Sequence, residues 1–141
     1  MADESKVYAG VLTEGNDLGR SEESLRVVME MAQALLFEAA NPRHAHGWRV
    51  FHDSDIPEDK ILVPGVIDST TNFIEHPELV AERIGRYTNI VGRDRVIAGT
   101  DCGFSTFAGF GAVDENIVYA KLASLAEGAR IASGRLWPRA E

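Results

Sequence analysis

The sequence predicts an α/β domain with a parallel sheet, and two observations support that class. Four short apolar runs alternate with segments whose apolar residues recur at helical spacing. No internal repeat, Gly/Ser-rich linker or long charge block divides the 141 residues. We therefore expect one domain over residues 1–141, in which about four parallel strands are joined by right-handed helical crossovers.

The predicted strands are the four apolar runs, which are rich in β-branched and other apolar side chains. They span residues 6–13, 34–39, 61–68 and 95–100. Three segments between and after them have the period of amphipathic helices. These segments are residues 21–33, residues 76–92 and the stretch that follows Asp114.

The ends of the helices have their own signals. Pro77 suits the first turn of the second predicted helix, and Gly92 is a natural stop. Asp114 is a suitable N-cap for the last helix. We expect a buried stripe on that helix, made of Ile117, Val118, Leu122, Leu125, Ala129 and Ala132.

Composition narrows the class of protein. With 45% hydrophobic and 26% charged residues, the chain has the profile of a soluble globular domain. Its formal net charge of −8 repels phosphate backbones, so we expect no nucleic-acid partner. No apolar run approaches the roughly 20 residues of a membrane span. The polar start shows no signal peptide, which predicts a cytoplasmic protein.

Polar side chains follow each predicted strand after the first. They are Glu38, Asp68, Asp101 and Cys102. Reactive side chains in parallel α/β folds gather at the carboxyl ends of the strands, so we expect these four to share one edge of the sheet.

Glu38 and Cys102 together suggest a zinc site, because zinc accepts both carboxylate and thiolate ligands. A simpler alternative is that Cys102 is a small buried residue and that Glu38 pairs with Arg43 or another cation. Spacing alone leaves both alternatives open.

Residues 40–60 have no convincing period and are expected to form a functional loop. If this segment is extended, His44 and His46 face one way and could bind a metal together. Otherwise they satisfy backbone groups or an acid in a polar loop. Asp68 has two possible roles as well, holding a substrate amine or hydroxyl or capping the turn that follows it.

Three segments together resemble the C-terminal catalytic barrel of cobalamin-independent methionine synthase and its relatives. They are LLFEAANPRHAHGW at 35–48, PGVIDSTTNFIEHPELVAERI at 64–84 and VIAGTDCGF at 96–104. The resemblance runs from about residue 17 to residue 137 and implies a partial (β/α)8 TIM-type barrel. Since a full barrel needs about 250 residues, the chain would correspond to the second half of one.

The resemblance also implies a function, which is zinc-dependent transfer of a methyl or alkyl group to a homocysteine-like thiol. It assigns Glu38 and Cys102 to two of four zinc ligands, and it makes Asp68 and Asp101 the expected substrate-binding acids. The family's His-x-Cys ligands fall on Val7 and Ala9, which cannot bind zinc, and its histidine near the substrate falls on Thr70. The substitute zinc ligands would be His44 and His46.

The alternative function is a half-barrel that acts as a binding or assembly module without metal. In either case an open half-barrel exposes apolar strand edges and part of its inner face. We therefore expect a homo-oligomer or a complementing half-barrel chain.

Overall fold

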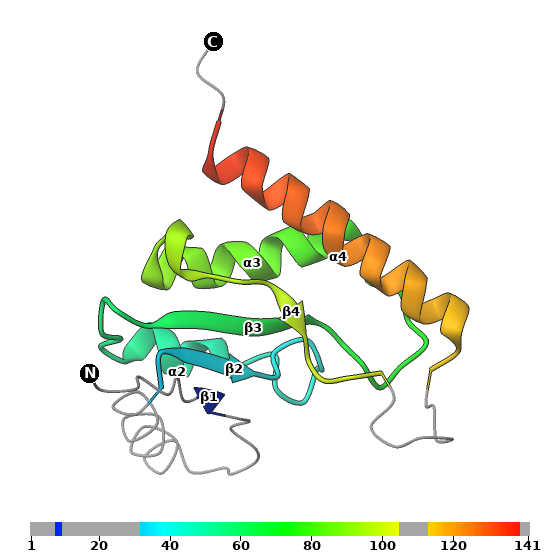
Figure 1. The fold of residues 1–141 in the computed structure, drawn as a ribbon, viewed down its shortest axis with the longest axis horizontal. Coiled ribbons are helices and arrows are strands. Elements are labelled where there is room, and N and C mark those ends of the chain that lie inside the picture. The colour runs from blue at the N-terminus through cyan, green and yellow to red at the C-terminus, as the bar shows by residue number, and fades with distance from the viewer. Residues whose placement is uncertain (1–7, 10–31, 105–112, 139–141) are drawn as a thin grey trace, which may run out of the picture.

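The sheet has the parallel arrangement that the sequence predicts (Figure 1). The computed structural model describes residues 8–9, 32–104 and 113–138. Its strands are β1 (Tyr8–Ala9), β2 (Ala34–Phe37), β3 (Ile61–Ile67) and β4 (Gly99–Thr100). They lie in the order β1-β2-β3-β4, and each neighbouring pair is parallel. The predicted helix at 21–33 lies outside the described residues, apart from its last two positions.

Strands β2 and β3 pair in continuous register, from Ala34 opposite Ile61 to Phe37 opposite Pro64. The pairing of β3 with β4 is irregular, because the register shifts between Gly65 and Ile67. Sequential strand order of this kind is found in barrels, where each crossover adds the next strand to the same side of the sheet.

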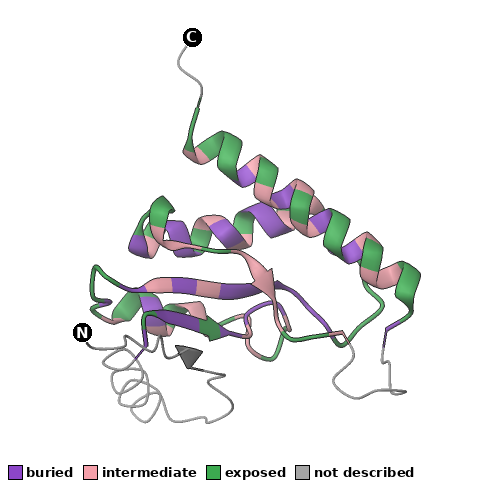
Figure 2. Cartoon of the chain, in the orientation of Figure 1, coloured by how far each residue is buried: buried purple, intermediate pink, exposed green. Residues whose placement is uncertain are grey.

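The helices are α2 (Trp48–Asp53), α3 (Pro77–Val91) and α4 (Glu115–Leu136), with a 3-10 turn η1 (Arg93–Arg95) before β4. They pack against one face of the sheet (Figure 1). In Figure 2 the buried residues run along β2, β3 and the inward side of α3.

Two apolar clusters form the core on that face. In the first, the rings of Phe37 and Phe51 stack with centroids 4.2 Å apart, and Tyr87 meets the ring of Phe37 edge-on at 5.3 Å. In the second, Val66 and Ile67 at the end of β3 pack with Val80 of α3 and Ala132 of α4. Because α3 contributes to both clusters, it joins the two halves of the core.

Helix α3 begins and ends where the sequence signals place it. The ring of His76 accepts a hydrogen bond from the backbone N–H of Glu78, and Pro77 occupies the first turn. Gly92 ends the helix with φ of 89°, a backbone conformation that favours glycine.

Helix α2 was not predicted, and the expectation that residues 40–60 form a plain loop is wrong in this part. The helix has six residues, of which only Phe51 is buried. A single buried side chain in so short a segment leaves no helical period in the sequence.

The predicted buried stripe of α4 is also partly wrong. Ala132 is buried as expected, but Leu122 is 40% exposed and the buried face is centred on Lys121, Ser124 and Gly128. Two of these side chains are polar, and both find hydrogen-bond partners in the loop before α3. Hydrophobic periodicity therefore located the helix correctly. It placed the buried face on the neighbouring side of the helix from the one that is buried.

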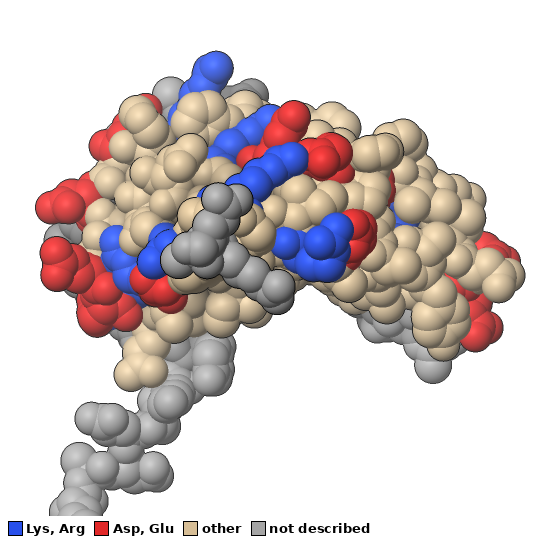
Figure 3. Space-filling view, turned by 90° about the horizontal axis from the view of Figure 1, so that it is seen from above, with Lys and Arg blue, Asp and Glu red and all other residues tan. Residues whose placement is uncertain are grey.

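Charged side chains line the outer surfaces of α3 and α4. Arg130 pairs with Glu127 along α4, and Arg135 of α4 pairs with Glu78 of α3. The view in Figure 3 shows basic and acidic side chains interspersed on the face seen from above. Within the described ranges, no helix is both long and apolar enough to cross a membrane.

Gly128 allows α4 to lie close to α3. A Cβ atom at this position would lie 2.8 Å from the carbonyl oxygen of Pro77 and would also meet Val80. We expect Gly128→Ala to lower the free energy of unfolding by about 1–3 kcal/mol, as overpacking does. Gly134→Ala on the same helix, where nothing lies within 4 Å, should instead stabilise by up to about 1 kcal/mol. Urea unfolding measures both, and equal effects would contradict close helix packing at Gly128.

Candidate functional site

The structure brings Glu38 and Cys102 into contact at the carboxyl edge of the sheet, with Asp101 beside them, whereas Asp68 binds Thr70 and Thr71 in its own turn after β3. An open pocket of about 410 Å³ lies beside the carboxyl ends of β2 and β4 and the middle of β3. It is lined by Leu36, Phe37, Val63, Gly99, Thr100, Asp101 and Cys102. Its walls are mainly apolar, and the polar groups stand where β4 ends.

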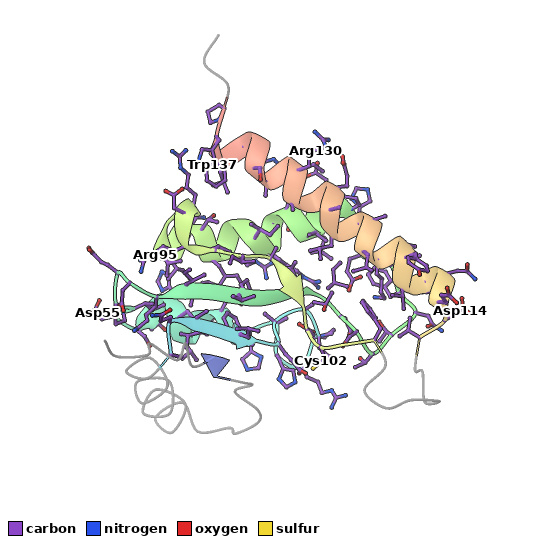
Figure 4. The ribbon with its side chains drawn as sticks, in the orientation of Figure 1. Asp55, Arg95, Cys102, Asp114, Arg130 and Trp137 are labelled. Carbon is purple, nitrogen blue, oxygen red and sulfur yellow. The ribbon has the colours of Figure 1, made fainter. Side chains whose placement is uncertain are left out.

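Cys102 and Glu38 are in direct contact. The Cys102 thiol donates a hydrogen bond to Glu38 Oε1 at 3.1 Å, although the two residues are 64 positions apart in the sequence. Figure 4 places Cys102 below the end of β4, beside the segment that follows β2. Cys102 is exposed, so the alternative that it is a small buried residue is wrong.

The pKa of the Cys102 thiol is raised. The hydrogen bond to Glu38 is the largest cause, and burial and the negative charges of Glu38 and Asp101 act in the same direction. In the chain alone, Cys102 is therefore held as a thiol.

His44 stands on the other side of Glu38, with Nε2 3.5 Å from Oε2. Residues 41–47 form turns, in which the N–H of His44 donates to the carbonyl of Asn41 at 2.9 Å. The extended arrangement considered for His44 and His46 is therefore wrong, and His46 is exposed. In the part of the chain that the structure describes, no group of three or more His, Cys, Asp or Glu residues has the geometry of a metal site.

Asp101 binds backbone rather than another side chain. Its Oδ1 accepts from the N–H groups of Ala39 and Ala40 at 2.8 and 2.9 Å, and its Oδ2 accepts from the N–H of Asn41 at 2.8 Å. Burial raises the pKa of Asp101, and these three donors oppose that rise without cancelling it. The segment after β2 is thereby attached to the end of β4.

Asp68 caps the turn that follows β3, which is one of the two roles its position suggests. Oδ1 accepts from the N–H and the hydroxyl of Thr70 at 2.9 and 2.8 Å, and Oδ2 accepts from the Thr71 hydroxyl at 2.9 Å. Burial raises the pKa of Asp68, but these bonds and the charge of Lys121 outweigh it and hold the pKa below the ordinary value. Asp68 is therefore ionised at neutral pH.

A buried ion pair supports this turn, and sequence reasoning missed it. Glu75 Oε1 accepts from the N–H of Asp68 at 2.8 Å, while Oε2 lies 3.0 Å from Lys121 Nζ. The side chains of Glu75 and Lys121 are 1% and 0% exposed. Lys121 also donates to the carbonyl of Phe73, and Ser124 donates to the carbonyl of Glu75. The one available signal was that Lys121 and Ser124 share a helix face with Gly128 and Ala132.

Arg83 of α3 bridges the end of β3 and the segment after β2. Its guanidinium donates to the carbonyl of Val66 at 2.8 Å and to the carbonyl of Ala40 at 3.1 Å. The Asn41 amide donates to the Thr70 hydroxyl at 3.4 Å. Arg83 thus holds the segment after β2 to β3, and Asn41 holds it to the loop after β3.

No protein-family model and no curated protein matches the sequence. Among solved structures, the chain is similar to a B12-independent methionine synthase from Shewanella sp. W3-18-1, determined in complex with selenomethionine. The TM-score is 0.60 and the identity 22%, over 83% of this chain and 31% of that chain. The chain thus spans about a third of the matched protein's length.

This similarity and the sheet topology together define the fold class of the chain. The fold is α/β, with parallel strands alternating with helices in an open sheet that corresponds to part of a barrel, as the sequence predicted. At 22% identity, the likeness to the methionine synthase shows the fold alone.

The buried pair gives a first prediction for this site. Lys121→Met would leave the buried Glu75 carboxylate with only the more distant Arg83, 4.0 Å away, as a cation, so we expect a loss of about 3 kcal/mol in the free energy of unfolding, at the lower end of the usual range. Adding Glu75→Gln should restore a large part of that loss, because no charge is then left unpaired. Arg130→Met breaks an exposed pair and should cause no measurable change in urea unfolding. A tolerated Lys121→Met would show that the pair is not buried in solution.

The raised pKa of the Cys102 thiol gives a second testable prediction. Alkylation by iodoacetamide needs the thiolate, so its rate should rise with pH at a midpoint above that of an ordinary cysteine. Glu38→Gln removes the charge that favours the thiol and should move the midpoint down. Glu127→Gln, a carboxylate variant on α4, should leave it in place. An unchanged midpoint in Glu38→Gln would show that the two side chains do not interact.

Proposed function

We propose that this chain carries part of a zinc-dependent site that transfers a methyl or alkyl group to a small, homocysteine-like thiol. The observation that supports this most directly is the contact between Cys102 and Glu38 at the carboxyl edge of the sheet. It occurs in a fold similar to part of a B12-independent methionine synthase, and the resemblance of the sequence motifs assigns the same two residues to zinc.

The donor atoms suit zinc chemically. Thiolate sulfur, carboxylate oxygen and imidazole nitrogen are its usual protein ligands. Sγ of Cys102 and Nε2 of His44 lie 3.1 and 3.5 Å from oxygens of Glu38. Ligand atoms about 2.0–2.3 Å from a tetrahedral zinc ion lie at similar separations of roughly 3.5 Å from each other. Glu38 and Cys102 would hold the ion, and His44 is the proposed additional ligand.

A bound zinc ion would supply the Lewis acidity that keeps a substrate thiol in its thiolate form. The substrate sulfur would then form a bond to the methyl carbon, and the donor would leave with the electron pair of the broken bond. The thiol proton goes to solvent.

The protein's acids would bind the rest of the substrate. Thr70 and Thr71 keep Asp68 ionised, so it could hold a substrate amine or hydroxyl. Asp101 was assigned with it to the substrate by the sequence resemblance. The apolar pocket wall of Leu36 and Val63 would contact the carbon chain.

Metal content tests the proposal. Protein expressed with added zinc is expected to contain about one zinc ion per chain. Glu38→Gln and Cys102→Ser should each lower the affinity by about tenfold or more, because each removes one ligand. Glu127→Gln should bind zinc as well as the unaltered chain. A chain free of metal after this treatment would overturn the proposal, and so would zinc that survives both ligand variants.

Cobalt gives a second readout of the same site. In the Co²⁺-loaded chain, a sulfur-to-metal charge-transfer band should depend on Cys102. Homocysteine should strengthen that band if its thiol becomes a ligand, whereas serine, which lacks the thiol, should not.

A second candidate function is an assembly module without metal, and one observation favours it. Leu36 of β2 is 43% exposed and Ile97, just before β4, is 56% exposed. Leu36 lies in β2 and Ile97 lies just before β4, and both strands border the pocket. Val63 of β3, which lines the same pocket, is half-buried. We propose that a second copy or a complementing half-barrel chain covers this face.

The mass in solution tests that surface. We expect a dimer or larger species by light scattering at micromolar concentration, and Ile97→Asp should shift it towards the monomer. Tyr119→Asp, at a 64% exposed position of α4, is the matched control and should not. A monomer at that concentration would exclude self-association.

A further inference from the structure

Three consecutive backbone N–H groups after β2 point at one carboxylate. The donors are Ala39, Ala40 and Asn41, and the acceptor is Asp101, about sixty positions further along the chain. Successive N–H groups of this kind form a concave site for an anion. Here the protein's own side chain fills it.

The neighbouring strand is shaped to admit this side chain. Gly65 of β3 lies against Asp101, and a Cβ atom at position 65 would lie 2.5 Å from Cα and 2.7 Å from the backbone nitrogen of Asp101. The N–H of Asp101 donates to the carbonyl of Ile67 at 2.8 Å, in the irregular part of the β3–β4 pairing. Only glycine at position 65 leaves room for this approach.

The link between Asp101 and Ala39 begins and ends next to Cys102 and Glu38, which are in contact with each other. Ala39 directly follows Glu38, and Asp101 directly precedes Cys102. We infer that Asp101 is a positioning residue, whose carboxylate binds the segment after β2 and thereby holds Glu38 against Cys102. This inference rests on the proposed function only in taking Glu38 and Cys102 as the working pair of the site. It differs from the substrate-binding role that the sequence resemblance suggests for Asp101.

Gly65→Ala tests the link without changing any charge. Its methyl group must displace Asp101, so the amide proton resonances of Ala39, Ala40 and Asn41 should lose the downfield shift that a carboxylate acceptor causes. Gly99→Ala is the matched control, because Gly99 is the strand partner of Gly65. Its added Cβ atom would make ordinary contacts, 3.7 Å from Val63 and 3.8 Å from the Pro64 carbonyl. In Gly99→Ala, the amide proton resonances of Ala39, Ala40 and Asn41 should stay in place.

The reactivity of Cys102 shows whether the link acts through Glu38. At a single pH, iodoacetamide should alkylate metal-free Gly65→Ala about fivefold faster than the unaltered chain, the factor that corresponds to one lost hydrogen bond. In a Glu38→Gln background, Gly65→Ala should have no further effect, because the contact it disturbs is already gone. Additive effects of the two substitutions would overturn the inference, and so would unshifted amide resonances in Gly65→Ala.

A second variant covers the case in which Gly65→Ala fails to fold. Asp101→Asn keeps one carbonyl oxygen for Ala39 and Ala40 but presents an amide donor to the N–H of Asn41. The Asn41 resonance should therefore move furthest of the three. Alkylation should again be faster, and the increase should be larger when Glu38 is present than in a Glu38→Gln background, because the charge of Asp101 also acts directly on Cys102. Equal alkylation rates for Asp101→Asn and the unaltered chain would count against the inference. All these measurements use metal-free protein, so a failed zinc experiment and a failed positioning role give different results.

Discussion

The carboxylate of Asp101 joins the ends of three neighbouring parallel strands. It follows β4, receives the N–H groups of the segment after β2, and lies in the space that Gly65 leaves on β3. Parallel strands bring their carboxyl ends to one edge, but they do not by themselves set how the loops beyond that edge are arranged. Charge-assisted hydrogen bonds to backbone do so here, and they determine which side chains of the two loops face each other.

A second buried carboxylate, that of Glu75, fixes the arrangement of the loop after β3. Glu75 binds the backbone of Asp68 and is neutralised by Lys121, which reaches it from α4. Buried ion pairs add little stability relative to apolar packing, but breaking one is costly. The pair therefore makes the position of α4 and the position of the Asp68 turn depend on each other. Through Arg83, α3 is coupled to the end of β3 and to the segment after β2.

The chemical site follows from this scaffold. Cys102, Glu38 and His44 come from the segments after β4 and β2, and Glu38 lies between the other two. Asp68 lies on the third loop, ionised and held by its own turn. The proposed zinc site rests on this thiol, carboxylate and imidazole, which lie near an apolar pocket. Leu36 and Ile97 are exposed in or beside the strands that border the pocket, and the proposed second chain would cover them.

Some features of this protein depend on local sequence and were predictable from it. The four apolar runs, Pro77 and Gly92 around α3, and the Asp114 cap act over a few residues, so the residue pattern determined the alternation of strands and helices. The parallel topology followed, and it brought Glu38 and Cys102 to one edge as expected.

Only the tertiary structure decided what each polar side chain does there. Asp101 and Asp68 are the same residue type at equivalent strand ends, yet one binds a distant backbone segment and the other caps its own turn. The burial of Lys121 depends on Glu75, which lies 46 positions away, and no local pattern contains that partner. Hydrophobic periodicity is a property of neighbours along the chain, whereas the satisfaction of buried charges and backbone donors depends on partners brought together by folding.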